Sequence, residues 1–85
     1  MTEIRMYSTQ WCGWCQQAKR LLADNGYKEI TEIDVDGWDD ARTRLESLTG
    51  QKTVPQIFVG QHHVGGFPEL ARLVQDGKLD ALVAG

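Results

Sequence analysis

The sequence has no long apolar run. No stretch approaches the roughly 20 residues that a membrane-spanning helix requires. The first residues, Met-Thr-Glu-Ile-Arg, also lack the apolar segment that a signal peptide contains. The sequence therefore predicts a cytoplasmic protein that has no membrane partner.

An excess of positive charge is absent as well. Nine lysines and arginines are outnumbered by 12 aspartates and glutamates, which gives a formal charge of -3. The basic residues are scattered along the chain, whereas a nucleic-acid interface needs a concentrated positive face. These features predict that the protein binds no nucleic acid.

The composition is that of a small globular protein. Hydrophobic residues make up 41% and charged residues 25% of the 85 residues, which suffices for one packed core but not for two. We therefore expect residues 1–85 to form a single domain, and we expect that domain to be a monomer.

Cysteine is scarce, and both cysteines lie in one short stretch, "STQWCGWCQQAKRLL", as Cys12 and Cys15. In a reducing compartment a close cysteine pair is more often catalytic or metal-binding than structural. The pair is therefore the first candidate for a functional site.

The pattern of apolar residues predicts alternating strands and helices. Residues 3–7 alternate polar and apolar side chains, as a strand does, and a helix is predicted from about Cys12 to Asn25-Gly26. A second strand is predicted over 29–35, followed by a second helix that opens at Asp36-Gly37 and ends at Gly50. The apolar positions of these two helices are Cys15, Ala18, Leu21 and Leu22, then Trp38, Ala41, Leu45 and Leu48.

The last third of the chain predicts a hairpin and a helix. Pro55 begins a strand over 56–59, Gly60-Gln61 fits a two-residue turn, and 62–64 is the return strand. Pro68 suits the first turn of a third helix. That helix and the short tail after Asp76-Gly77 carry Leu70, Leu73, Val74, Leu79, Leu82 and Val83. The order βαβαββα with a short helical tail is that of an α/β domain.

The two cysteines are predicted to differ in reactivity. Cys12 lies at the start of a helix, where free backbone N–H groups and the helix dipole favour a thiolate. Such a position lowers the pKa of a cysteine from about 8.5 to roughly 3.5–7.5. Cys15 lies one turn further on, among the apolar positions, and is close enough to form a disulfide. We expect Cys12 to attack a disulfide and Cys15 to resolve the mixed disulfide.

Trp11 and Trp14 flank the cysteine pair. One interpretation is a flat apolar surface on which a peptide or a small thiol docks. The alternative is that the indole rings pack into the core.

The motifs together resemble one family. Cys-Gly-Trp-Cys follows a strand, Thr53-Val54-Pro55 precedes a hairpin, and Gly65-Gly66 precedes the last helix. With "TVPQIFVGQHHVGG" and "GKLDALV", the chain resembles the glutaredoxins of the thioredoxin-fold superfamily from end to end, in particular the small bacterial dithiol members. The resemblance implies a thioredoxin-like fold with a four-stranded mixed sheet flanked by helices. It also implies a cis peptide bond between Val54 and Pro55.

The resemblance further implies the reaction and its partners. A glutaredoxin is a thiol-disulfide oxidoreductase that reduces protein or mixed disulfides, with glutathione as co-substrate and no tightly bound cofactor. Glutathione would lie across the Thr53-Val54 backbone, and the turn from Gly66 to Glu69 would hold its γ-glutamyl carboxylate. The expected binding residues are Trp14, Thr53, Val54, Pro55, Gly66, Phe67 and Glu69.

Three departures from the family pattern concern this binding site. Gly13-Trp14 replaces the usual proline-tyrosine, which loosens the start of the helix. Thr9 replaces a frequent lysine, for which Lys52 or Arg42 is a candidate substitute. Pro68 replaces an acidic residue and offers no N–H group, so Glu69 is the candidate contact for the γ-glutamyl ammonium.

Several alternatives remain open. With Gly13 in place of proline, the active-site motif resembles that of glutaredoxins that carry a [2Fe-2S] cluster between two subunits. In those proteins the first cysteine of each subunit and bound glutathione hold the cluster. "WCGWC" is similar to mycoredoxins, which use another small thiol, and "GGFP" is similar to electron donors that thioredoxin reductase reduces. A binding module without chemistry is a further alternative. A zinc site of Cys12, Cys15, His62 and His63 is disfavoured because adjacent strand residues point to opposite faces, so no metal is expected.

Overall fold

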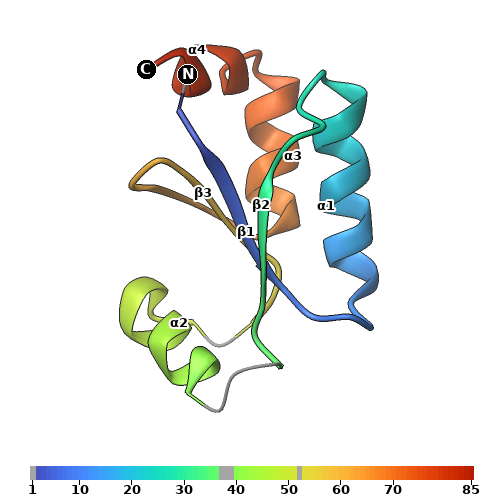
Figure 1. Cartoon of the computed structure of the whole chain (residues 1–85). Helices are drawn as coiled ribbons and strands as arrows, with labels where there is room; N and C mark the ends of the chain where they lie inside the picture. Colours follow the sequence, from blue (N-terminus) through green and yellow to red (C-terminus); the bar gives the residue numbers. More distant parts are fainter. Residues whose placement is uncertain (1, 37–39, 52) are drawn as a thin grey trace.

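The computed structural model describes residues 2–36, 40–51 and 53–85. Its elements follow the predicted order of strands and helices (Figure 1). They are β1 (Ile4–Ser8), α1 (Gly13–Asp24), β2 (Thr31–Asp34), α2 (Ala41–Thr49), β3 (Gln56–Val59), β4 (His62–Gly65), α3 (Phe67–Gln75) and α4 (Leu79–Ala84). The predicted α/β class and the order βαβαββα with a helical tail are confirmed.

The four strands form one mixed sheet in the order β2-β1-β3-β4. β1 pairs in parallel with β2, because α1 provides the crossover that a parallel pair needs. β3 pairs antiparallel with both β1 and β4. The turn between β3 and β4 begins at Gly60, whose φ of +60° suits a glycine in this position.

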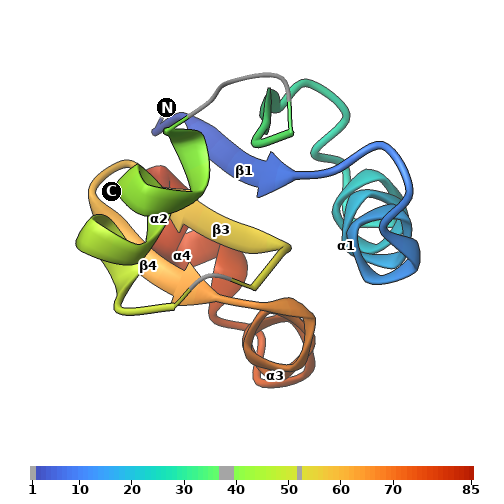
Figure 2. The same ribbon diagram turned by 90° about the horizontal axis from the view of Figure 1, so that it is seen from below.

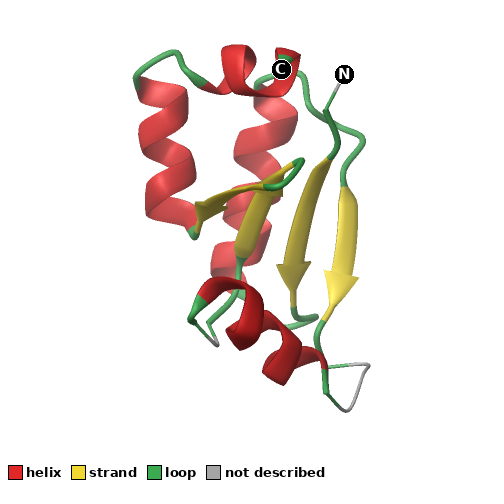
Figure 3. Ribbon diagram, turned by 90° about the vertical axis from the view of Figure 1, so that its left-hand side faces the viewer, coloured by secondary structure: helices red, strands yellow, loops and turns green. Residues whose placement is uncertain are grey.

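The sheet separates two layers of helices (Figures 2 and 3). Side chains on β1 alternate, so Ile4 and Met6 pack with α1, α3 and α4 in the main core. Tyr7 lies on the other face, in a smaller cluster with Ala41 and Leu45 of α2. The main core joins ten buried residues: Ile4, Met6, Cys15, Ala18, Leu22, Ile57, Val59, Leu70, Leu79 and Val83.

The two ends of the described chain meet at α4. The Thr2 N–H donates to the carbonyl of Val83 at 3.1 Å. Tyr27, in the loop after α1, donates a hydrogen bond to the Asp80 carboxylate. That hydrogen bond, with smaller contributions from burial and from the negative charge, raises the pKa of Tyr27 above its ordinary value. The loop after α1 is thereby joined to the C-terminal helix.

Three sequence predictions differ from the structure. The second helix was expected to open at Asp36-Gly37, but α2 begins at Ala41, and the Asp36 N–H instead donates to the Asp34 side chain in a turn. β2 begins at Thr31 rather than at residue 29, because the pairing with β1 starts at Arg5 opposite Thr31. Leu48 was expected on the buried face of α2 but is 61% exposed. This nine-residue helix buries only Ala41 and Leu45, so its last turn contributes little to the core. The expected apolar position Trp38 lies outside the described residues.

None of the helices in the described residues has the length and apolar character needed to cross a membrane.

The core predicts how two leucine substitutions will differ. Leu70 is fully buried and is the one buried residue of α3, so Leu70→Ala should lower the free energy of unfolding by about 2–5 kcal/mol. Leu48→Ala, at the exposed site, should change it by less than about 0.5 kcal/mol. Urea unfolding of both variants measures the difference. Equal losses would contradict the assignment of α3 to the core.

Candidate active site

Cys12 is the N-cap residue of α1. Its backbone is extended, with φ -89° and ψ 110°, and its sulfur accepts a hydrogen bond from the Cys15 N–H at 3.0 Å. A Thr9 carbonyl 3.4 Å from the Cys12 N–H closes the preceding turn. An N-cap side chain replaces one of the missing hydrogen bonds of a helix start, and the helix dipole favours negative charge there. The fold therefore places the Cys12 sulfur where a thiolate is stabilised.

Cys15 lies one turn into the helix and has no exposed surface. It is joined to Cys12 in a disulfide, with the two Cα atoms 5.2 Å apart. Cys12 is only partly buried at the edge of the core. The structure thus has the arrangement that the helical spacing predicts, with an accessible first sulfur and an enclosed second one.

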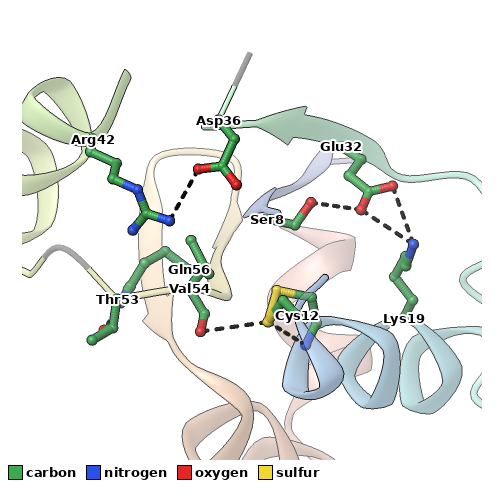
Figure 4. The surroundings of a disulfide bond; sticks show 10 residues. Ser8, Cys12, Lys19, Glu32, Asp36, Arg42, Thr53, Val54 and Gln56 are labelled. Atoms are coloured by element: carbon green, nitrogen blue, oxygen red, sulfur yellow. Dashed lines mark hydrogen bonds and ion pairs between the residues drawn. A yellow bond between two sulfur atoms is a disulfide. The ribbon is translucent and has the colours of Figure 1, made fainter. Parts of the chain in front are cut away.

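The loop before β3 lies directly against the first cysteine. The peptide bond between Val54 and Pro55 is cis, as the family resemblance implies. The carbonyl oxygen of Val54 is 3.8 Å from the Cys12 sulfur, although 42 residues separate them in sequence (Figure 4). The pairing of β3 with β1 brings this loop beside the start of α1, which follows β1.

A cleft of about 380 Å³ opens next to this contact. All seven predicted binding residues line it, together with Gln51, Gln56 and Pro68, which the sequence analysis had not proposed as binding residues. One wall comes from Trp14 on α1 and the loop before β3, and the other comes from the start of α3. The residues that line the cleft are Trp14, Gln51, Thr53, Val54, Pro55, Gln56, Gly66, Phe67, Pro68 and Glu69.

Both tryptophans beside the cysteines are at the surface. Trp11 is 86% exposed and Trp14 is 62% exposed, so the alternative that they pack into the core is wrong. The Trp14 ring lies 5.3 Å from the ring of Phe67, centroid to centroid. A second, open hollow lies between these rings and Gly13. An apolar surface therefore borders the cleft on the side of α1.

A side chain from the first turn of α3, that of Glu69, occupies part of the start of this helix. Glu69 accepts a hydrogen bond from the Gly66 N–H at 2.6 Å, which is the half of a capping box that a glycine N-cap residue allows. Pro68 in the first turn has no N–H group. A ligand anion at this helix start would meet fewer free N–H groups than the sequence alone suggested, and one oxygen of Glu69 is already used.

The candidate cations are placed differently from each other. Arg42 forms an ion pair with Asp36 at 3.2 Å, on the α2 side of the site. Lys19, which was not among the candidates, pairs with Glu32, and Glu32 also accepts a hydrogen bond from the buried Ser8 hydroxyl (Figure 4). Lys52 lies outside the described residues. The structure therefore assigns Arg42 a carboxylate partner within the protein.

The two histidines have different environments. His62 is exposed on the edge strand β4, whereas His63 is half-buried and its Nε2 lies 2.6 Å from Gln56 Oε1. Among the described residues, no three His, Cys, Asp or Glu side chains are grouped so that they could hold a metal ion. Of the two cysteines only Cys12 has exposed surface, so an iron–sulfur cluster would need further ligands from outside the chain.

Comparisons with known proteins agree with this geometry. The family model described as Glutaredoxin matches residues 4–64. A glutaredoxin of Neisseria meningitidis is 47% identical over 98% of both chains, and glutaredoxin 3 of Escherichia coli is 35% identical over 98% of this chain and 99% of its own.

Solved structures of glutaredoxins have the same fold. The glutaredoxin of Brucella melitensis superposes with a TM-score of 0.85 at 40% identity, over 98% of this chain and 89% of that one. A buckwheat glutaredoxin in complex with glutathione gives a TM-score of 0.87 at 30% identity, over 98% and 77% of the two chains. The predicted thioredoxin-like fold is confirmed.

These similarities, and the Cys-x-x-Cys pair at the start of α1, define a thiol-disulfide oxidoreductase with two active-site cysteines. The chain belongs to the glutaredoxin family.

The glycine after Cys12 leads to a prediction about the start of α1. Gly13 is the first helical residue, and a side chain there would meet nothing within 4 Å. Cys12 already has the extended backbone that a following proline requires. Gly13→Pro should therefore raise the free energy of unfolding by about 0.4–1 kcal/mol.

Gly50→Pro is the matched control, because its φ of +75° is one that proline cannot adopt. This variant should be destabilised. Urea unfolding of the reduced proteins measures both changes, and a loss of stability in Gly13→Pro would contradict the described start of α1.

Proposed function

We propose that this chain reduces glutathione mixed disulfides and protein disulfides, with glutathione as its co-substrate. The single observation that carries the proposal is the position of the Cys12 sulfur. It lies at the start of α1, 3.8 Å from the Val54 carbonyl, beside the cleft of about 380 Å³. If the peptide main chain of a substrate lies along Val54, the disulfide of that substrate comes close to the Cys12 sulfur.

The reaction proceeds by thiol-disulfide exchange. The Cys12 thiolate attacks the glutathione sulfur of a mixed disulfide, and the substrate leaves as a thiolate. Cys12 then carries glutathione in a new disulfide. The thiolate of a second glutathione attacks the sulfur of the bound glutathione, which forms oxidised glutathione and returns Cys12 as a thiolate.

Protein disulfides take a second route that uses Cys15. Cys12 attacks one sulfur of the substrate and forms a mixed disulfide with it, and the other substrate sulfur leaves as a thiolate. Deprotonated Cys15 then attacks the Cys12 sulfur and releases the substrate as a dithiol. The product is the Cys12–Cys15 disulfide, the state in which the structure holds the pair. Two glutathione molecules reduce it in two further exchanges.

The cleft has dimensions and chemistry that suit a tripeptide. Its volume of about 380 Å³ lies at the lower end of the range for small-molecule sites, roughly 300–1,000 Å³. We assign the Val54 main chain to pairing with the extended backbone of glutathione, as in β-strand addition. Trp14 and Phe67 would cover its apolar side. A relative with 30% identity, from buckwheat, is described as a glutaredoxin–glutathione complex, which supports the choice of thiol.

The contact at the γ-glutamyl end is proposed in a modified form. Gly66 and Glu69 line the cleft, but the Gly66 N–H already donates to Glu69. We assign the second carboxylate oxygen of Glu69 to the ligand's ammonium group. Residues 1–85 would act as one domain and as a monomer in the cytoplasm, where a reduced thiol pool returns the cysteines to the dithiol state.

The test compares two sources of electrons for the reduction of a glutathione mixed disulfide. Turnover should require glutathione and glutathione reductase, and NADPH with thioredoxin reductase alone should give none. Activity only with thioredoxin reductase, or only with another small thiol, would contradict the role of glutathione.

Two cysteine variants serve as controls in the same assay. Cys12→Ser should lose the activity, because the remaining thiol, that of Cys15, is fully buried and out of reach of a substrate disulfide. Cys15→Ser should keep the reduction of the glutathione mixed disulfide but lose the reduction of a protein disulfide through the dithiol route. Full activity of Cys12→Ser would show that the assayed reaction does not use this site.

A further inference from the structure

One polar side chain is buried where the sheet meets the cleft. Gln56, the first residue of β3, is 1% exposed and is followed by Ile57, Phe58 and Val59. Burial of an amide without partners is costly, so such a group is normally hydrogen-bonded at every opportunity. Its partners therefore indicate why a polar residue is placed in an otherwise apolar strand.

The amide of Gln56 bridges the loop to the edge strand. Its Nε2 donates to Gln51 Oε1 at 2.8 Å and to Thr53 Oγ1 at 3.2 Å. Its Oε1 lies 2.6 Å from Nε2 of His63. An amide oxygen only accepts, so the His63 Nε2 carries the proton and donates it. With these three bonds, both N–H groups and the oxygen of the amide have partners.

His63 is itself fixed by the sheet. Its ring lies 5.0 Å from the Phe58 ring, centroid to centroid, at an angle of 32° between the ring planes. Phe58 and His63 are also partners in the pairing of β3 with β4. The neighbouring His62 is exposed, because successive residues of a strand point to opposite faces. A rigid ring on β4 therefore holds the amide oxygen and turns the amide N–H groups toward the loop.

We propose that His63 and Gln56 are positioning residues for substrate binding. They touch no reacting atom. His63 orients the Gln56 amide, and Gln56 holds Gln51 and Thr53 in the wall of the cleft beside Val54. The proposal rests on the proposed function, in which a glutathione adduct lies across Thr53 and Val54. Loss of this bridge should weaken substrate binding and leave the chemistry at Cys12 unchanged.

The first test uses His63→Phe, which keeps a ring against Phe58 but removes the N–H donor. The KM for a glutathionylated peptide should rise about fivefold, the equivalent of one ordinary hydrogen bond, with kcat within about twofold of the parent value. His62→Phe, the same change on the exposed face of the same strand, should leave both constants unchanged. A general structural defect would instead lower kcat as well as raise KM, or it would have the same effect in His62→Phe as in His63→Phe.

The second test is a double-mutant cycle. Gln56→Met should raise KM at least as much as His63→Phe, because the donors to Gln51 and Thr53 are lost. In the Gln56→Met background, His63→Phe should have no further effect on KM, since the two residues act through one amide. Gln56→Glu keeps the acceptor for His63 but loses the N–H donors to Gln51 and Thr53, so it should raise KM by the same factor. This variant replaces Gln56→Met in the cycle if the methionine variant does not fold.

The outcomes separate this inference from the proposed function. An unchanged KM in His63→Phe, or additive effects in the double variant, would overturn the positioning role while the parent protein still reduces the mixed disulfide with glutathione. A parent protein without glutathione-dependent turnover would instead overturn the proposed function.

Discussion

The hydrogen bond from the Cys15 N–H to the Cys12 sulfur, at 3.0 Å, is the interaction on which the rest of the site depends. It exists because β1 ends at Ser8, a turn follows, and α1 then starts with the N–H of Cys15 directed at the sulfur. Charge on the sulfur is therefore stabilised by a backbone N–H group and by the start of the helix. This stabilisation does not depend on a lysine at position 9, where the chain has Thr9.

The remainder of the fold brings substrate-binding groups to that sulfur. The sheet order places β3 beside β1, so the loop with the cis bond lies against Cys12, although the two are distant in sequence. α3 packs on the same face as α1, and this brings Phe67 against Trp14. On the opposite face, His63 and Gln56 join the edge strand to the loop. The starts of α1 and α3, the loop before β3 and the first residue of β3 thus meet at a single cleft.

Sequence reasoning went furthest where the signal was local. The helix start at Cys12, the burial of Cys15 and the turn at Gly60 follow from the spacing of residues and from glycine. Contacts between distant segments were not predictable in this way. That Glu69 caps its own helix, and that Arg42 pairs with Asp36, depends on side-chain geometry. Leu48 had the right spacing for the core, but α2 buries only two residues. Gln56 did carry a signal, because it is a polar residue at the start of an apolar strand, yet its partners lie in segments that only the fold brings together.

The most direct measurement is the titration of the Cys12 thiol in the reduced Cys15→Ser variant, followed by thiolate absorbance in the ultraviolet. The backbone N–H of residue 15 remains in this variant, so the stabilising hydrogen bond is preserved. The account predicts a pKa well below the ordinary value of about 8.5, within roughly 3.5–7.5, and therefore a thiolate at neutral pH. A pKa of about 8.5 or higher would contradict the account, because the sulfur would then be protonated under the conditions in which it is supposed to attack.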